Sequence, residues 1–87
     1  MCTMISARVP VAGSARSAGG WTDVAEATLS YDHATHVWSD HALRIDFVPR
    51  GAPSAGSVAI ELDLASGRSL LLRLQEIIAA AERSEIE

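Results

Sequence analysis

The apolar residues of this chain change their spacing once, and this change constrains the fold more than any other feature. Up to residue 64 they recur at every second position, which is the period of a strand with one apolar face. From residue 66 to residue 81 they recur every three or four positions, which is the period of an amphipathic helix. The pattern therefore predicts a sheet followed by one helix.

Four segments with the two-residue period are expected to be strands, and they cover residues 3–11, 21–31, 43–47 and 58–64. Pro10 has no amide hydrogen to donate, so the first strand is expected to lie at an edge of the sheet or to end at this proline. The segment 13–20 contains only Gly, Ser, Ala and one Arg, which predicts a flexible loop that could act as a lid.

The helix is expected to begin at Ser66, whose hydroxyl can accept a hydrogen bond from the amide of Ser69 as an N-cap. Its apolar side chains fall within an arc of roughly 120°, the width of a core-facing stripe, and they are Leu70, Leu71, Leu74, Ile77, Ile78 and Ala81. The predicted fold is a single α+β domain over residues 1–87. It consists of a four-stranded antiparallel sheet with one C-terminal amphipathic helix packed on one face, in the order β-β-β-β-α.

Size and charge indicate which partners to expect. A chain of 87 residues has a small core, and its single cysteine cannot form an internal disulfide. We therefore expect a homodimer, and its seam could be formed by Leu72, Ala79 and Ile86 on the outer side of the helix. A net charge of −4 without a basic run argues against nucleic acid and against an anionic membrane as partners.

Two further features of the sequence bear on where the protein works and where it comes from. No apolar run approaches the roughly 20 residues that span a bilayer, and no basic region followed by an apolar core begins the chain. A cytoplasmic location is therefore expected. All 7 basic residues are arginine and lysine is absent, which is a bias of GC-rich genomes and suggests an actinobacterial source.

The residues that could carry chemistry concentrate between positions 31 and 47, where all 3 histidines of the chain lie. The two-residue period places His33 and His41 on the apolar side of the sheet, at the ends of adjacent strands. As cross-strand neighbours they are expected to bring their side chains within roughly 4.5–8 Å of each other. Asp32 and Asp40 flank this pair, and a carboxylate can hold one imidazole nitrogen and raise the basicity of the other.

These residues are predicted to form an acid–base catalytic site that acts on a small organic molecule without a cofactor. One of His33 and His41 would be the base and the other the acid, oriented by one of the two aspartates and assisted by Tyr31 or Cys2. Further contacts to the ligand are expected from His36, Trp38, Trp21, Arg44 and Asp46.

Three other interpretations stay open. Histidines at strand ends are commonly structural residues with their hydrogen bonds satisfied. His33, His36 and His41 could instead bind zinc or another transition metal, with Cys2 or an aspartate as a further ligand, although their spacing is not that of a zinc finger. The polar face of the sheet could also hold a ligand or a partner enzyme, which would make the protein a non-catalytic binding module.

Several segments of the chain resemble those of a known family. They are the start Met1-Cys2-Thr3, the run from Ala18 to Trp21, the triplet Tyr31-Asp32-His33, and the run from His41 to Phe47 followed by a strand and an amphipathic helix. Together they resemble a family of small actinobacterial proteins of unknown function that occur in specialised-metabolite gene clusters. The resemblance implies a small tailoring enzyme, such as a cyclase, an isomerase or a lyase that uses only acid–base residues.

Overall fold

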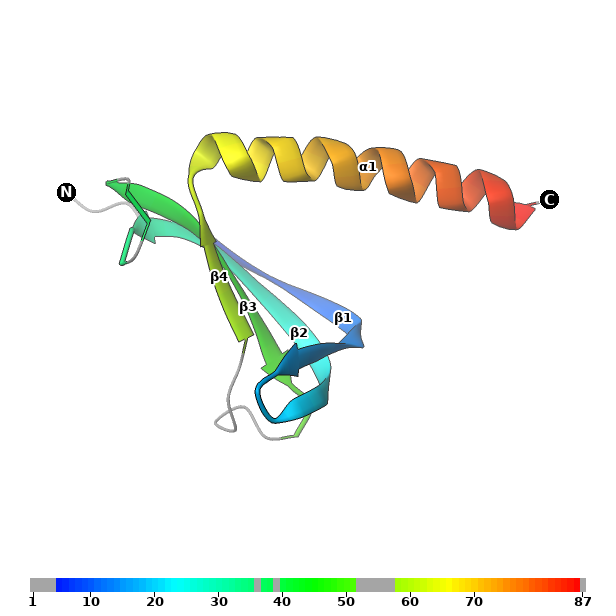
Figure 1. Cartoon of the computed structure of the whole chain (residues 1–87), viewed down its shortest axis with the longest axis horizontal. Coiled ribbons are helices and arrows are strands. Elements are labelled where there is room, and N and C mark those ends of the chain that lie inside the picture. The colour runs from blue at the N-terminus through cyan, green and yellow to red at the C-terminus, as the bar shows by residue number, and fades with distance from the viewer. Residues whose placement is uncertain (1–4, 36, 39, 52–57, 87) are drawn as a thin grey trace.

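The structure, a computed structural model, describes residues 5–35, 37–38, 40–51 and 58–86. Over these residues the chain forms four strands and one helix (Figure 1): β1 (Ile5–Ser17), β2 (Gly20–His33), β3 (His41–Pro49), β4 (Val58–Leu62) and α1 (Leu64–Ile86). The strands form one antiparallel sheet in the order β1-β2-β3-β4, so each strand pairs with the next along the chain. The predicted α+β fold, a four-stranded antiparallel sheet followed by a C-terminal helix, is confirmed.

The first hairpin is longer than the sequence pattern predicts. Strand β1 continues to Ser17 and pairs with β2 up to Gly20, so the turn is reduced to residues 18–19. Gly20 has a φ of 108°, a conformation that favours glycine, directly after this turn. The predicted flexible lid over residues 13–20 is therefore wrong. Small residues give no hydrophobic signal, yet their backbone groups can still complete the ladder of hydrogen bonds.

A bulge in β2 changes which side chain is buried near the end of the sheet. Val24 pairs with Pro49 and Glu26 pairs with Val48, so Ala25 is an extra residue on β2. The bulge shifts the alternation by one, and Val24 rather than Ala25 points into the apolar side, where it is 4% exposed. Strand β1 has its own register shift after Pro10 and lies at the edge of the sheet, which confirms the edge position expected of this proline.

Helix α1 begins three residues earlier than predicted because Asp63, not Ser66, is its N-cap. The Asp63 carboxylate accepts a hydrogen bond of 2.7 Å from the backbone amide of Ser66, and its backbone carbonyl accepts one of 3.0 Å from the amide of Gly67. An aspartate in this position satisfies an amide of the first turn that has no partner within the helix. Ser66 therefore lies inside the helix, in the first turn.

The Asp63 cap predicts a stability that depends on pH. Hydrogen bonds from the Ser66 hydroxyl and backbone amide hold the pKa of the Asp63 carboxyl below its ordinary value of 3.8. A carboxyl whose pKa is lowered in the folded state stabilises that state above its unfolded pKa, and this contribution is lost as the pH falls through the lowered value. We expect Asp63→Ala to shorten the helix at neutral pH, as measured by far-UV circular dichroism.

The control for this prediction is Asp63→Asn, because an asparagine keeps the accepting oxygen but carries no charge. This variant should keep the helix at neutral pH and lose the part of the pH dependence that the carboxylate supplies. Equal pH profiles for wild type and Asp63→Asn below pH 3.8 would show that another group is responsible.

The helix lies on the apolar side of the sheet, as predicted, but it meets the sheet only near its first turns. The helix comes close to the sheet at Gly67, where an added Cβ would collide with the Leu43 side chain. Farther along, the apolar side chains of α1 stay exposed, and Figure 1 shows α1 extending beyond the sheet toward the C-terminus. Among the described residues the buried apolar side chains are Val24, Ala27, Ala42 and Pro49. The core of one chain is therefore very small.

Helices that cross a membrane are both long and strongly apolar. Within the described residues, no helix combines the length and the apolar character that a membrane span requires.

Candidate functional site

An open groove of about 320 Å³ runs between the apolar face of the sheet and the first turns of α1. Its walls are almost entirely apolar because the alternating residues of β1, β2 and β3 point toward the helix. They include Ile5, Leu29, Tyr31, Leu43, Ile45 and Leu71. A concave apolar surface of this size is typical of a site for a small organic ligand.

Three aromatic rings form a row at the end of this groove. The His33 and His41 rings stack with their centroids 4.9 Å apart, and the His41 ring stacks on Tyr31 at 5.6 Å. The register places His33 directly opposite His41, as the alternation predicts, and Tyr31 opposite Leu43. Tyr31 and His41 are half-buried, whereas His33 is exposed. The row therefore leads from the groove wall, at Tyr31, to the solvent at His33.

The two aspartates beside the histidines hold the backbone at the strand ends. The Asp32 carboxylate accepts a hydrogen bond of 2.8 Å from the backbone amide of His33. The backbone carbonyl of Asp40 accepts one of 3.2 Å from the amide of Ala34 and closes the connection between β2 and β3. The alternation of β2 turns the Asp32 side chain to the face opposite the rings. Orientation of an imidazole by Asp32 or Asp40 stays a prediction.

The structure does not bring the two tryptophans into this site. Trp21 lies at the opposite end of β2, where it is 69% exposed. The Arg16 guanidinium lies over its ring, 5.7 Å from the ring centroid. Trp38 lies on the connection between β2 and β3 and is fully exposed. Neither indole lines the groove. Cys2 and His36, which were predicted as an assisting residue and a ligand contact, lie outside the described residues.

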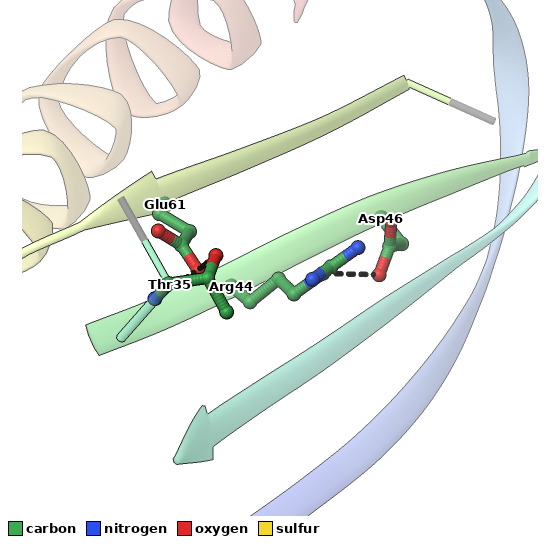
Figure 2. Close-up of polar contacts among 4 residues, drawn as sticks. All are labelled: Thr35, Arg44, Asp46 and Glu61. Carbon is green, nitrogen blue, oxygen red and sulfur yellow. Dashed lines mark hydrogen bonds and ion pairs between the residues drawn. The ribbon is translucent and has the colours of Figure 1, made fainter. Parts of the chain in front are cut away.

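Arg44 and Asp46 point to the other face of the sheet, away from the histidines. The Arg44 Nε lies 2.9 Å from the Asp46 Oδ2, and Figure 2 shows this ion pair along β3. Both residues border the polar face that the alternation predicts. Arg44 borders both the apolar groove and a hollow on the polar face, whereas Asp46 borders neither of the two.

A polar contact on this second face was not predicted from the sequence. The Thr35 hydroxyl and backbone amide donate hydrogen bonds of 2.6 and 3.1 Å to the Glu61 Oε2 (Figure 2). This contact ties the connection between β2 and β3 to β4. Beside it lies a shallow hollow of about 350 Å³, to which Val37, Arg44 and Ala59 also contribute. The alternation along β4 predicts that Glu61 points to the polar face, but nothing in the sequence identifies Thr35 as its partner.

The described part of the chain contains no group of side chains that could bind a metal ion. Among residues 5–35, 37–38, 40–51 and 58–86, no three His, Cys, Asp or Glu side chains lie close enough to hold a metal ion. The predicted set of His33, His36 and His41 includes one residue outside this part, so metal binding by it stays a prediction.

A four-stranded meander, one long C-terminal helix and an open apolar groove with aromatic rings at its end define a small single-sheet α+β protein. The chain belongs to the family described as "Family of unknown function (DUF6295)", whose model matches residues 1–87. The match confirms that the chain is a member of a family of unknown function, as the resemblance of its segments indicates. No curated protein and no solved structure shows a significant match to this chain.

Proposed function

We propose that this protein binds a small, largely apolar organic molecule in the groove and transfers protons on it with His33 and His41. The observation that supports the proposal is the position of Tyr31, which lines the groove and also stacks on His41. A molecule held against Leu29 and Leu43 would therefore lie beside the imidazoles, and its polar end would face the rings.

The proposed chemistry uses the two imidazoles in complementary protonation states. A neutral imidazole removes a proton from a carbon next to a carbonyl group, and the other, protonated imidazole donates a proton to the carbonyl oxygen, which gives an enol. When the first imidazole returns its proton to carbon and the enol hydroxyl proton goes back to the second, the carbonyl group and both imidazoles are regenerated, so no oxidant or reductant is needed. This step is shared by isomerases, by cyclases that close carbon–carbon bonds and by lyases. The family resemblance would place such a reaction in actinobacterial specialised metabolism, and the sequence predicts a cytoplasmic location for it.

The proposal can be tested without the natural substrate by using 2-tetralone, an apolar ketone with acidic hydrogens next to its carbonyl group. We expect the protein to exchange these hydrogens for deuterium in D2O faster than the same concentration of free imidazole does, as followed by proton NMR. Loss of one imidazole in His33→Gln or His41→Gln should slow the protein-catalysed exchange by roughly 10²-fold, the lower end of what a positioned acid or base contributes.

The matched control is Thr22→Gln, because Thr22 is an exposed residue at the far end of β2. It should exchange the ketone hydrogens at the wild-type rate, and all three variants should keep the wild-type circular dichroism spectrum. Equal exchange rates for wild type and both histidine variants would refute the proposed chemistry. Chemical shifts of Tyr31 and Leu43 that respond to 2-tetralone in those same variants would show that the groove nevertheless binds apolar molecules.

A second candidate is a non-catalytic module that holds a ligand or a partner enzyme on the polar face. It is favoured by the hollow beside Glu61, where the Arg44–Asp46 ion pair and the Thr35–Glu61 hydrogen bonds hold four polar side chains in place. Charge reversal in Arg44→Glu would then abolish binding, while His33→Gln and His41→Gln would have no effect.

Metal binding is separated from both candidates by elemental analysis of untagged protein. One equivalent of zinc or another transition metal that is lost in His33→Ala would establish a metal site and would change the role of the histidines from proton transfer to ligation.

A further inference from the structure

Beyond its first turns, the apolar side of α1 is not covered by the described part of its own chain. Its side chains Leu70, Leu71, Leu74, Ile77 and Ile78 are between 43% and 66% exposed. Leu64, Leu71 and Ile78 are spaced by seven residues, and Gly67, Leu74 and Ala81 follow the same repeat. This is the alternating three- and four-residue spacing of a helix that packs along its length against another element. The sheet of the same chain covers only the first turns of this stripe.

The surface area of the chain is too large for a compact monomer. A monomer of 9.2 kDa is expected to expose about 4,900 Å², whereas this chain exposes 6886 Å². The radius of gyration is 14.9 Å, compared with about 12 Å for a compact domain of this length. The excess surface is roughly 2,000 Å² per chain, so two chains together have about 4,000 Å² to bury. This is within the range of obligate homodimers.

We propose that a second copy of the chain buries this surface, with α1 of each copy packed along the apolar groove of the other. Each chain carries both surfaces that such an arrangement needs, a groove with almost entirely apolar walls and a helix with an apolar stripe. If a two-fold axis relates the two copies, each groove is covered by the helix of the other copy. No uncovered groove or helix then remains for a third copy to bind. The charges of α1 suit self-association, because both signs occur in equal number along the helix: Arg68, Arg73, Arg83, Glu76, Glu82 and Glu85.

The proposed dimer would also complete the groove. A helix from the partner would roof the open side between Leu29, Leu43 and Ile45 and exclude water from a bound molecule. The inference does not depend on the proposed proton transfer, because it is carried by the exposed stripe and the excess surface. A dimer without catalysis and a monomer with catalysis are therefore distinguishable results.

The first test is the molar mass of the protein by light scattering after size-exclusion chromatography. We expect twice the chain mass of 9.2 kDa for wild type and a shift toward monomer for Leu74→Glu and for Ile78→Glu. The matched control is Leu72→Glu, which introduces the same charge on the outer side of the helix, where the sequence pattern suggests a different seam. This variant should remain a dimer. A monomeric wild type, or dissociation by Leu72→Glu alone, would overturn the proposal.

A second measurement keeps the proposal testable if the glutamate variants fail to fold. Labelled and unlabelled wild-type chains are mixed, unfolded and refolded together, and isotope-filtered NMR then reports only contacts between chains. We expect contacts between methyl groups of α1, such as Leu74 and Ile78, and methyl groups of the partner's sheet face. A dimer in which these contacts are absent would overturn the exchange of helices.

Discussion

Replacing Val24 by aspartate is expected to unfold the protein. Val24 is 4% exposed and lies on the apolar face after the β2 bulge, with Phe47 and Val58 bordering the same hollow. A carboxylate there would lose its hydration or take up a proton, and the basic side chain that borders this hollow, Arg16, is exposed and lies over the Trp21 ring. The loss should exceed about 3 kcal/mol. A domain with so small a core cannot retain its fold after such a loss.

The measurement is urea denaturation of wild type and variant, followed by circular dichroism. Thr22→Asp is the matched control, because it places the same side chain two residues away on the same strand at an exposed position. This control should change the free energy of unfolding by less than about 0.5 kcal/mol. A cooperative unfolding transition of Val24→Asp at the wild-type urea concentration would show that the bulge does not direct residue 24 inward.

Replacing Gly67 by phenylalanine is expected to displace α1 from the sheet. Gly67 lies close to the sheet, and a Cβ there would collide with the Leu43 side chain. In Gly67→Ala the end of the Leu43 side chain can rotate into the open groove, and alanine favours the helix, so this variant should be nearly neutral. The phenyl ring of Gly67→Phe cannot be accommodated in this way. We expect a loss of roughly 1–3 kcal/mol in the free energy of unfolding.

Ser69→Phe controls for the intrinsic cost of a phenylalanine in the helix, because Ser69 is exposed in the same turns of α1. Its urea midpoint should stay close to that of wild type. The two phenylalanine variants should also differ in the methyl resonance of Leu43, which ring currents shift only when the ring is nearby. Equal midpoints for Gly67→Phe and Ser69→Phe would mean that the helix does not rest on Leu43.

Alternation alone was sufficient to predict the central part of the sheet. Leu43, Ile45 and Phe47 alternate with charged residues, so only one register turns all three to the apolar side. The same alternation, continued to the strand ends, is enough to place His33 opposite His41. The stacking of these rings follows from the register, because cross-strand neighbours on one face are close in space.

Features that depend on backbone geometry were not predictable from the same pattern. The long β1–β2 hairpin forms through residues with short side chains, which carry no periodic signal. The bulge at Ala25 inserts one residue without a glycine or proline beside it on β2 to mark it. The position of the N-cap was missed because Asp63 also fits the polar parity of the preceding strand, so its capping role is hidden.

The candidate site was predictable in part for similar reasons. The pairing of His33 and His41 and the position of Tyr31 follow from the alternation of side chains along the strands. The tryptophans, in contrast, were predicted to contact the ligand only because they are aromatic. Trp21 and His33 lie at opposite ends of β2, so residue type alone did not place the indole near the histidines. The contact of Thr35 with Glu61 joins a connection to a strand that comes much later in the chain, and only the folded structure brings them together.

The strand order has a consequence for the speed of folding. Because each strand pairs with its neighbour in the chain, the sheet can form from local contacts, which is the topology of rapidly folding domains. If α1 is supplied to each groove by another molecule, the last step of folding becomes a collision between two chains. Refolding followed by fluorescence should then show an early phase independent of protein concentration and a later phase whose rate increases with it. Newly made chains at low abundance would remain as sheets with free helices until they meet.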